Sequence, residues 1–175
     1  MMLLSENSIT GYECNEINLN HEEVMMKDNV KVLIVDDSKI YQMMIQDTLS
    51  DYKTVVAADG VEALEILMDQ QDIDVVVLDI NMPRMNGFQV LERIESDMKE
   101  RELSVIILTN NDEIDDELKG LSKGAVDYIR KPLNGPSLLK RVEVHLNLVF
   151  TRKKLNLYRR ALIEATGTDL LNHTL

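Results

Sequence analysis

Four short aliphatic runs, each closely followed by a polar residue, constrain the fold of this chain more than any other feature. The runs are Val32–Val35, Ile73–Leu78, Ser104–Leu108 and Ala125–Ile129. Asp36 and Asp37 follow the first, Asp79 the second and Thr109 the third, and Lys131 lies just beyond the fourth. Runs that are apolar on both faces are typical of central parallel strands. The polar residues are therefore expected to meet at the carboxyl edge of one sheet, where open α/β folds place their chemistry.

Amphipathic segments separate these runs and are predicted to form helices. They span Ser38–Leu49, Val61–Met68, Phe88–Met98, Asp112–Leu121 and a long stretch from Pro136 to Thr166, while Lys53–Ala58 adds a strand. Ser38 is expected to cap the first helix and Gly124 to end the fourth. The residues expected to face the core from the first helix are Ile40, Met43, Met44 and Leu49. Five strands alternating with five helices predict the α/β fold class, a doubly wound parallel sheet with helices on both faces.

Charge divides the chain of 175 residues into three parts. Residues 1–29 hold six acidic side chains and one basic one, a net charge of -5, and are predicted to form a flexible arm with a short helix near Asn20–Met26. Residues 30–150 form the expected domain. Residues 151–175 hold five basic and two acidic side chains and are predicted to be a helical extension or linker. The overall charge of -12 argues against direct binding to nucleic acid.

The composition also restricts the cellular setting and the kind of site. Cys14 is the only cysteine, which excludes a disulfide framework and a thiolate metal site. No run approaches the ~20 apolar residues of a membrane span, and the start lacks the basic region of a signal peptide. A cytoplasmic protein without membrane contact is therefore expected.

The last predicted helix is longer than a domain of this size needs. Proline and glycine are absent from Ser137 to Thr166, and Gly167 is the expected stop. Leu148, Leu155 and Leu162 recur every seven residues, which is a short coiled-coil pattern. The pattern predicts a homodimer through this helix. A single helix that covers the sheet and then frays is the alternative interpretation.

The three carboxylates at the sheet edge predict a metal site. Asp36, Asp37 and Asp79 would repel one another strongly unless a divalent cation or a proton neutralised them. An oxygen-only set without histidine or cysteine suits Mg²⁺ or Mn²⁺, completed by water and phosphate oxygens. An ionised aspartate can itself attack phosphorus, and the Lys131 ammonium and the Thr109 hydroxyl would then stabilise the transferred group.

Four separated motifs resemble the receiver domain of two-component response regulators, as in chemotaxis regulators. They are Val35–Ser38, Leu78–Gly87, Ile107–Thr109 and Gly124–Pro132. The resemblance covers residues 30–150 and implies a flavodoxin-like five-stranded sheet of order 2-1-3-4-5. It also implies that Asp79 is the phosphoacceptor and a metal ligand, that Asp37 binds Mg²⁺ directly, and that Asp36 binds it through water. The backbone carbonyl of Asn81 would be the remaining protein ligand.

The resemblance further implies a switch. Thr109 would hydrogen-bond the phosphoryl group, Tyr128 would turn inward, and Lys131 would pair with the phosphoryl group and precede a cis peptide bond to Pro132. A histidine kinase or phosphotransfer protein would phosphorylate Asp79. The change would reach the face of the fourth helix, fifth strand and fifth helix, and so an output domain or partner. The chain would catalyse only its own phosphorylation and dephosphorylation, with any effector enzyme domain outside it.

Two residues, Asn110 and Leu133, depart from the family pattern. Leu133 replaces a common phenylalanine after Lys131 and Pro132 and is expected to change only the packing. Asn110 stands where the family usually has alanine or glycine, which suits a vestigial receiver that acts as a phosphorylation-independent interaction module. An aspartate-nucleophile phosphatase would need a second aspartate two residues after Asp79, and that position is Asn81. The acidic residues Asp112, Glu113, Asp115, Asp116 and Glu117 are expected to form a solvated helix face, with discrimination between partners as the alternative.

Overall fold

The computed structural model describes residues 30–101, 103–110 and 114–166 and has the predicted α/β architecture. Its strands are β1 (Lys31–Val35), β2 (Lys53–Ala57), β3 (Val75–Asp79), β4 (Ser104–Asn110) and β5 (Asp127–Lys131). They form one parallel sheet in the order β2-β1-β3-β4-β5, which confirms the predicted flavodoxin-like topology. The expected arm, its helix near Asn20–Met26 and the stop at Gly167 lie outside the described residues.

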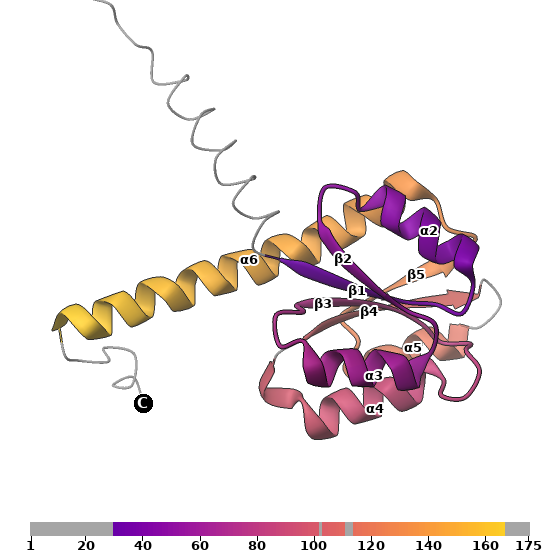
Figure 1. Ribbon diagram of the computed structural model, residues 1–175, viewed down its shortest axis with the longest axis horizontal. Helices are drawn as coiled ribbons and strands as arrows, with labels where there is room; N and C mark the ends of the chain where they lie inside the picture. Colours follow the sequence, from indigo (N-terminus) through magenta and orange to yellow (C-terminus); the bar gives the residue numbers. More distant parts are fainter. Residues whose placement is uncertain (1–29, 102, 111–113, 167–175) are drawn as a thin grey trace, which may run out of the picture.

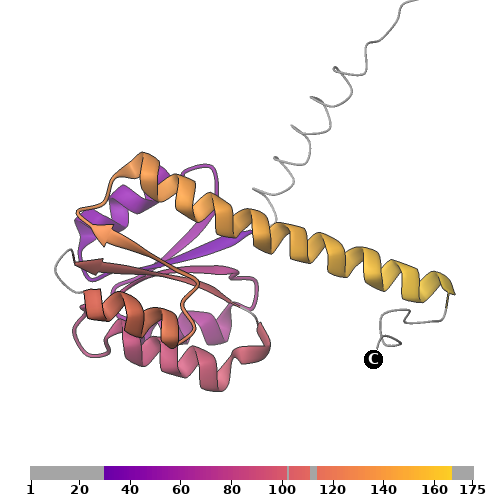
Figure 2. The same ribbon diagram turned by 180° about the vertical axis from the view of Figure 1, so that it is seen from behind.

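Helices cover both faces of the sheet. They are α2 (Lys39–Thr48), α3 (Gly60–Asp69), α4 (Gly87–Asp97), α5 (Ile114–Ser122) and α6 (Gly135–Thr166), with a 3₁₀ turn, η1, at Lys99–Arg101. Helices α2 and α6 lie on one face, and α3, α4 and α5 lie on the other (Figures 1 and 2). None of the helices in this described part combines the length and apolar composition of a membrane span.

Each strand contributes to two separate cores because successive side chains point to opposite faces. Val32 and Ile34 of β1 join the core under α2 and α6, whereas Leu33 and Val35 join the core under α3 and α4. All five residues of β3 are buried. The central strands are thus enclosed on both faces, and their carboxyl ends are held in fixed positions.

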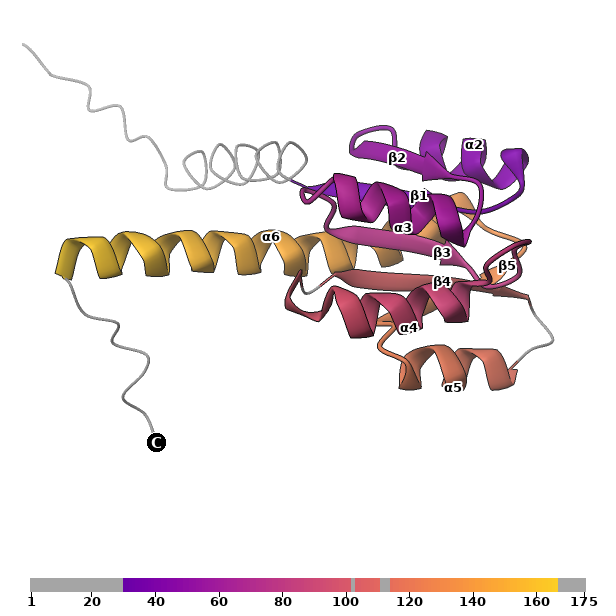
Figure 3. The ribbon, with the colours of Figure 1, turned by 60° about the horizontal axis from the view of Figure 1, so that its bottom comes forward.

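Helix α6 covers the sheet with its first half only. Leu138, Val142, Leu146 and Val149 are buried against the sheet, and Val149 is the last buried residue of the helix whose exposure the structure describes. The rest of α6 extends away from the domain (Figure 3). The predicted long helix is therefore present, and its leucines Leu148, Leu155 and Leu162 are 61%, 64% and 49% exposed.

Several local predictions were wrong. In α2, Ile40 and Met43 are 78% and 68% exposed, and the residues buried within the helix are Gln42 and Ile45. The Ser38 side chain makes no capping hydrogen bond. Strand β5 begins two residues late, at Asp127, because Ala125 still bonds to the carbonyl of Gly120 at the end of α5, 3.1 Å away. By contrast, the prediction for Gly124 is confirmed, because this residue has the left-handed conformation of a helix end, with φ of 98°.

Candidate functional site

The sheet topology brings the predicted polar residues to one edge. Asp36 directly follows β1, Asp79 ends β3, Thr109 lies near the end of β4 and Lys131 ends β5. Carboxylate oxygens of Asp36, Asp37 and Asp79 lie within 4.8 Å of one another. Asp36 and Asp79 are buried and Asp37 is exposed. The three carboxylates therefore form a site that opens to solvent on the Asp37 side.

Lys131 connects the two buried carboxylates. Its Nζ lies 2.8 Å from Oδ2 of Asp36 and 3.0 Å from Oδ2 of Asp79. The ring of Tyr41, on α2, lies 4.4 Å from the same ammonium. The peptide bond from Lys131 to Pro132 is cis, as expected from the resemblance. One cation thus serves two buried anions, with the exposed Asp37 carboxylate beside them.

The pKa values reflect this arrangement. Burial is the main cause of the raised pKa of Asp79, and the neighbouring charge of Asp36 adds to it. The Lys131 ammonium and the backbone N–H of Asn81 oppose the rise. Burial lowers the pKa of Lys131, but its contacts with Asp36 and Asp79 outweigh this and the pKa is raised. Lys131 therefore keeps its positive charge, whereas the negative charge of Asp79 is only partly neutralised by its surroundings.

Gln42 positions Asp36 and was missed at the sequence level. Its Nε2 donates to the backbone carbonyl of Asp36 at 2.6 Å and to that of Ala57 at 3.2 Å. It therefore joins the carboxyl ends of β1 and β2 at Asp36, one of the three acidic residues. The backbone N–H of Ser38 donates to Oδ1 of Asp36 at 2.9 Å, so this carboxylate is held from two sides. The only sign of this role in the sequence is that Gln42 is a polar residue five positions after Asp37.

The loop after β3 has little room near Asp79. A side chain at Gly87 would collide with the backbone carbonyl oxygen of Asp79, so only glycine lets α4 start this close. Asn86 caps α4 through a capping box with Gln89. Arg84 has a φ of 62° and forms an ion pair with Asp59 at the start of α3. These contacts hold the backbone around Asp79 in one shape.

The predicted switch residues lie on the two strands beyond β3. Thr109 is buried, and its hydroxyl donates to the carbonyl of Asn110 at 3.3 Å. Asn110 is exposed and pairs in register with Lys131. Tyr128 is half-buried, and the guanidinium of Arg130 lies 5.8 Å from its ring centre. Thr109 and Tyr128 therefore lie on neighbouring strands, β4 and β5.

Glu117 is not part of a solvated face as expected. It is 5% exposed, and its two carboxylate oxygens accept hydrogen bonds from Arg130 at 2.5 and 3.0 Å. The hydrogen bond from Arg130 is the main cause of the lowered pKa of Glu117, and Tyr128 contributes a smaller effect. The other acidic side chains of this predicted face lie outside those that the structure describes. Glu117 thus connects α5 to β5 beside Tyr128.

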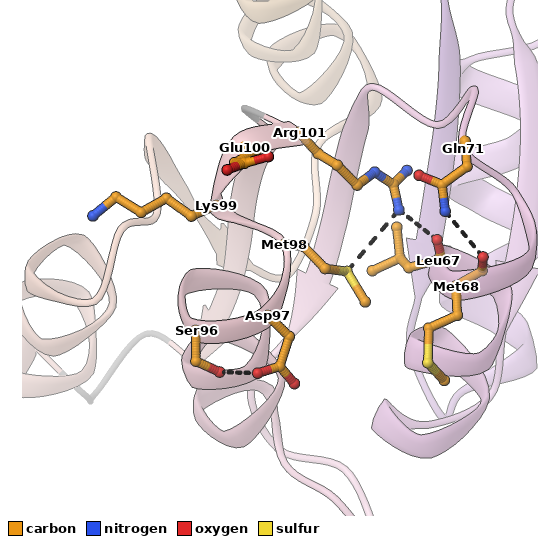
Figure 4. A pocket seen from close by; sticks show the side chains of 9 residues that line it. All are labelled: Leu67, Met68, Gln71, Ser96, Asp97, Met98, Lys99, Glu100 and Arg101. Atoms are coloured by element: carbon orange, nitrogen blue, oxygen red, sulfur yellow. Dashed lines mark hydrogen bonds between the residues drawn. The ribbon is translucent and has the colours of Figure 1, made fainter.

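A pocket of about 630 Å³ lies away from the acidic cluster. Leu67, Met98 and Arg101 line it, between the carboxyl-terminal ends of α3 and α4 (Figure 4). Arg101 donates to the carbonyls of Leu67, Gln70 and Ile73 and so ties the end of α3 to the chain before β3. The position and contacts of Arg101 are those of a structural residue.

The donor set fits a hard divalent cation. Carboxylate oxygens are the ligands that Mg²⁺ prefers, and this ion usually keeps several waters. The exposed Asp37 leaves space for them beside the buried pair. The acidic cluster is therefore suited to the metal that receiver domains generally bind.

The family model of the response regulator receiver domain matches residues 32–143 of this chain. The chain belongs to this family. Its predicted membership and its role in two-component signalling are thereby confirmed. Its sequence is 36% identical over 120 residues to the chemotaxis protein CheY1 of Helicobacter pylori, covering 67% of this chain and 97% of that one. It is 33% identical to the chemotaxis response regulator CheY4 of Vibrio cholerae, with a TM-score of 0.61 over 66% of this chain and 98% of that one.

Other relatives are longer than the matched region. A probable cyclic di-GMP phosphodiesterase of Vibrio cholerae is 42% identical over 116 residues, which cover 66% of this chain and 26% of the relative. The response regulator MprA of a Mycobacterium species is 35% identical over 119 residues, covering 67% of this chain and 50% of the relative. The chain therefore spans between a quarter and a half of these two relatives.

Proposed function

We propose that this receiver domain is a switch operated by phosphorylation of Asp79. The supporting observation is the contact of one lysine, Lys131, with both Asp36 and Asp79, while Asp37 lies open beside them. Such a site has a nucleophile, a cation for the incoming phosphoryl group and space for a metal. It lacks a general base and needs none, because a carboxylate is already ionised near pH 7.

The roles of the residues follow from their positions. An oxygen of Asp79 attacks phosphorus, the bond from phosphorus to the donor breaks, and the donor leaves with its electron pair. Asp37, the Asn81 carbonyl and Asp79 would bind Mg²⁺ or Mn²⁺ directly, and Asp36 would bind it through water. When bound, the metal neutralises charge on the phosphoryl oxygens. Lys131 pairs with the phosphoryl group, and Thr109 donates its hydroxyl to it.

The output follows from charge and packing. The phosphorylated side chain carries about -1.5 to -2 charges where the carboxylate carried -1, and its added acceptor oxygens draw Thr109 toward Asp79. Tyr128, on the neighbouring strand, then moves inward past Arg130 and Glu117. The face made by α5, β5 and α6 changes shape as a result. Helix α6 continues from this face beyond the domain and would carry the change to an output domain or partner.

The donor is a histidine kinase or phosphotransfer protein acting in the cytoplasm. With a phosphohistidine donor, the phosphorus–nitrogen bond breaks as the bond to Asp79 forms. The exposed leucine stripe of α6 would support a weak homodimer. The domain would catalyse only its own phosphorylation and dephosphorylation. Any effector activity belongs to another domain or partner.

Labelling with a small phosphodonor such as acetyl phosphate tests the proposal. We expect the wild type to gain the mass of one phosphoryl group only when Mg²⁺ is present. Asp79→Asn removes the nucleophile and should abolish this gain. Asp69→Asn, which alters an exposed carboxylate at the end of α3, is the matched control and should label normally. Equal labelling of Asp79→Asn would contradict the assignment, and an unlabelled wild type would favour the vestigial interaction module.

A further inference from the structure

The part of α6 beyond Val149 combines an exposed apolar stripe with a basic surface. Leu155 and Tyr158 are 64% and 62% exposed, and Leu162 continues the stripe. Between residues 150 and 164 the helix carries five basic side chains and one acidic one, Glu164. The basic residues are Arg152, Lys153, Lys154, Arg159 and Arg160. A partner that covers this segment therefore needs apolar and acidic side chains.

The charges beside the stripe disfavour a second copy of the helix. If Leu155 takes position a of a heptad, Lys154 takes g and Arg159 takes e. In a parallel pair, Lys154 of each chain then faces Arg159 of the other. Residues at e and g select the partner of a coiled coil, and like charges there oppose association. The seam consequently favours an acidic partner.

The chain itself contains such a partner. Residues 1–29 have a net charge of -5 and include apolar residues, among them Ile17, Leu19 and Val24. Glu16, Glu22 and Glu23 lie among these apolar residues. The composition of the segment therefore complements the projecting part of α6 in both charge and apolar content.

The acidic segment joins the domain beside this part of α6. The backbone N–H of Lys31 donates to Oδ2 of Asp74 at 3.2 Å, and Nζ of Lys153 lies 2.7 Å from the same oxygen. One carboxylate thus connects the first residue of β1 to the start of the basic segment. From Lys153 to Glu164 an α-helix rises about 17 Å, whereas 29 residues reach roughly 43 Å even as a helix. The segment can therefore reach the whole basic surface.

We infer that residues 1–29 dock in cis on the basic and apolar surface of α6 between residues 150 and 164. The short connection gives the segment a high effective concentration at this surface. A second copy of the chain, or any other helix that binds the stripe, then has to displace the segment. This inference stands apart from the role of Asp79 and holds whether or not the domain is phosphorylated.

A spin label on Cys14, the only cysteine, tests the inference on the full chain. In an isotopically labelled chain that carries the spin label, we expect amide signals of residues 150–164 to broaden. In a mixture of isotopically labelled Cys14→Ser chains with spin-labelled, isotopically unlabelled chains, we expect no broadening. Absence of broadening in the first sample would overturn the inference. Equal broadening in both samples would show that a second copy is the occupant and would also overturn it.

Charge reversal provides the second arm of the test. Glu16→Lys, Glu22→Lys and Glu23→Lys together should abolish the broadening. Arg152→Glu, Lys154→Glu and Arg159→Glu added to that variant should restore it. Glu65→Lys, Asp69→Lys and Glu100→Lys together, at three exposed positions on α3 and η1, should leave it unchanged as a control for the same change in net charge. Broadening that survives the arm substitutions would exclude docking by charge complementarity.

Discussion

The ammonium of Lys131 lies 3.0 Å from the carboxylate of Asp79, and this contact joins the end of β5 to the end of β3 across β4. The same ammonium also contacts Asp36. Because one positive charge is shared by two buried carboxylates, the negative charge of Asp79 is only partly neutralised and the pKa of Asp79 stays raised. The site is thus arranged to gain stability when a metal binds.

Asp79→Asn is expected to stabilise the metal-free protein at pH 7 by about 1 kcal/mol, because it removes a buried charge that is incompletely neutralised. The raised pKa of Asp79 means that the folded state holds its proton more tightly than the unfolded state. The cost of ionisation is therefore absent below the ordinary pKa of ~3.9 and is fully present above the folded value. Urea unfolding at pH 7 and near pH 3 should show the variant's advantage at the higher pH alone. An advantage of equal size at both values would contradict this explanation.

Asp37→Ala is expected to remove the stabilisation of the protein by Mg²⁺ while leaving the metal-free stability nearly unchanged. Asp37 is exposed, whereas Asp36 is buried against Lys131 and the backbone of Ser38. Asp36→Ala should therefore lower the metal-free stability and reduce the metal response less completely. At ten times the dissociation constant, the wild type should gain ~1.4 kcal/mol. Thermal melts in Ca²⁺-free buffer, with and without Mg²⁺, measure the effect. An unaltered Mg²⁺ response in Asp37→Ala would exclude Asp37 as a metal ligand.

The residues at the strand ends were predictable from the sequence for a physical reason. Asp79 and Thr109 each follow an apolar run, and parallel strands bring such ends together. Gln42 and Glu117 were not predictable in the same way, because their roles depend on contacts made only in the folded chain. Gln42 bonds to the carbonyls that end β1 and β2, and Glu117 pairs with Arg130 on another element. The apolar residues of α2 do not mark a single buried face, because Ile40 and Met43 are exposed whereas Ile45 is buried. The sequence therefore did not show which face of this helix packs against the sheet.

Asn110→Ala is expected to speed phosphorylation by small donors severalfold, because Asn110 is exposed directly after Thr109 and pairs in register with Lys131. A smaller side chain at this position leaves more space for the donor. Rates of mass gain with acetyl phosphate measure the effect. Asn110→Gln, which keeps the amide but adds length, is the matched control and should not be faster than the wild type. A slower Asn110→Ala variant would show that the amide assists the reaction.

Arg130→Met is expected to destabilise the protein at pH 7, because it removes the main partner of the buried carboxylate of Glu117. The lowered pKa of Glu117 means that the ion pair stabilises the fold above the ordinary pKa of ~4.3, and that this stability is lost as pH falls through the folded value. The difference from the wild type should therefore shrink in acid. Arg93→Met breaks an exposed pair with Asp97 within one helix and should cost less. Equal losses for the two variants in urea unfolding would show that the burial of Glu117 carries no weight.

Lys154→Glu is expected to strengthen self-association of the chain through α6. In a parallel dimer, the change replaces two facing pairs of like charge, Lys154 with Arg159, by two pairs of opposite charge. Each wild-type seam also contains Thr151 between Leu148 and Leu155, so the wild-type dimer should be weak. Sedimentation velocity over a range of concentrations should show a lower dissociation constant for Lys154→Glu than for the wild type.

Two further variants separate the stripe from the overall charge. Arg160→Glu makes the same change of charge at heptad position f, away from the seam, and should strengthen association less than Lys154→Glu. Leu155→Lys should abolish association in either background, because it places a charge in the apolar seam, whereas Leu157→Lys lies off the stripe and should not. Leu155 and Leu157 are 64% and 67% exposed, so the two substitutions start from similar surroundings. Equal effects of Lys154→Glu and Arg160→Glu would attribute the association to net charge, and monomers throughout would exclude the parallel dimer.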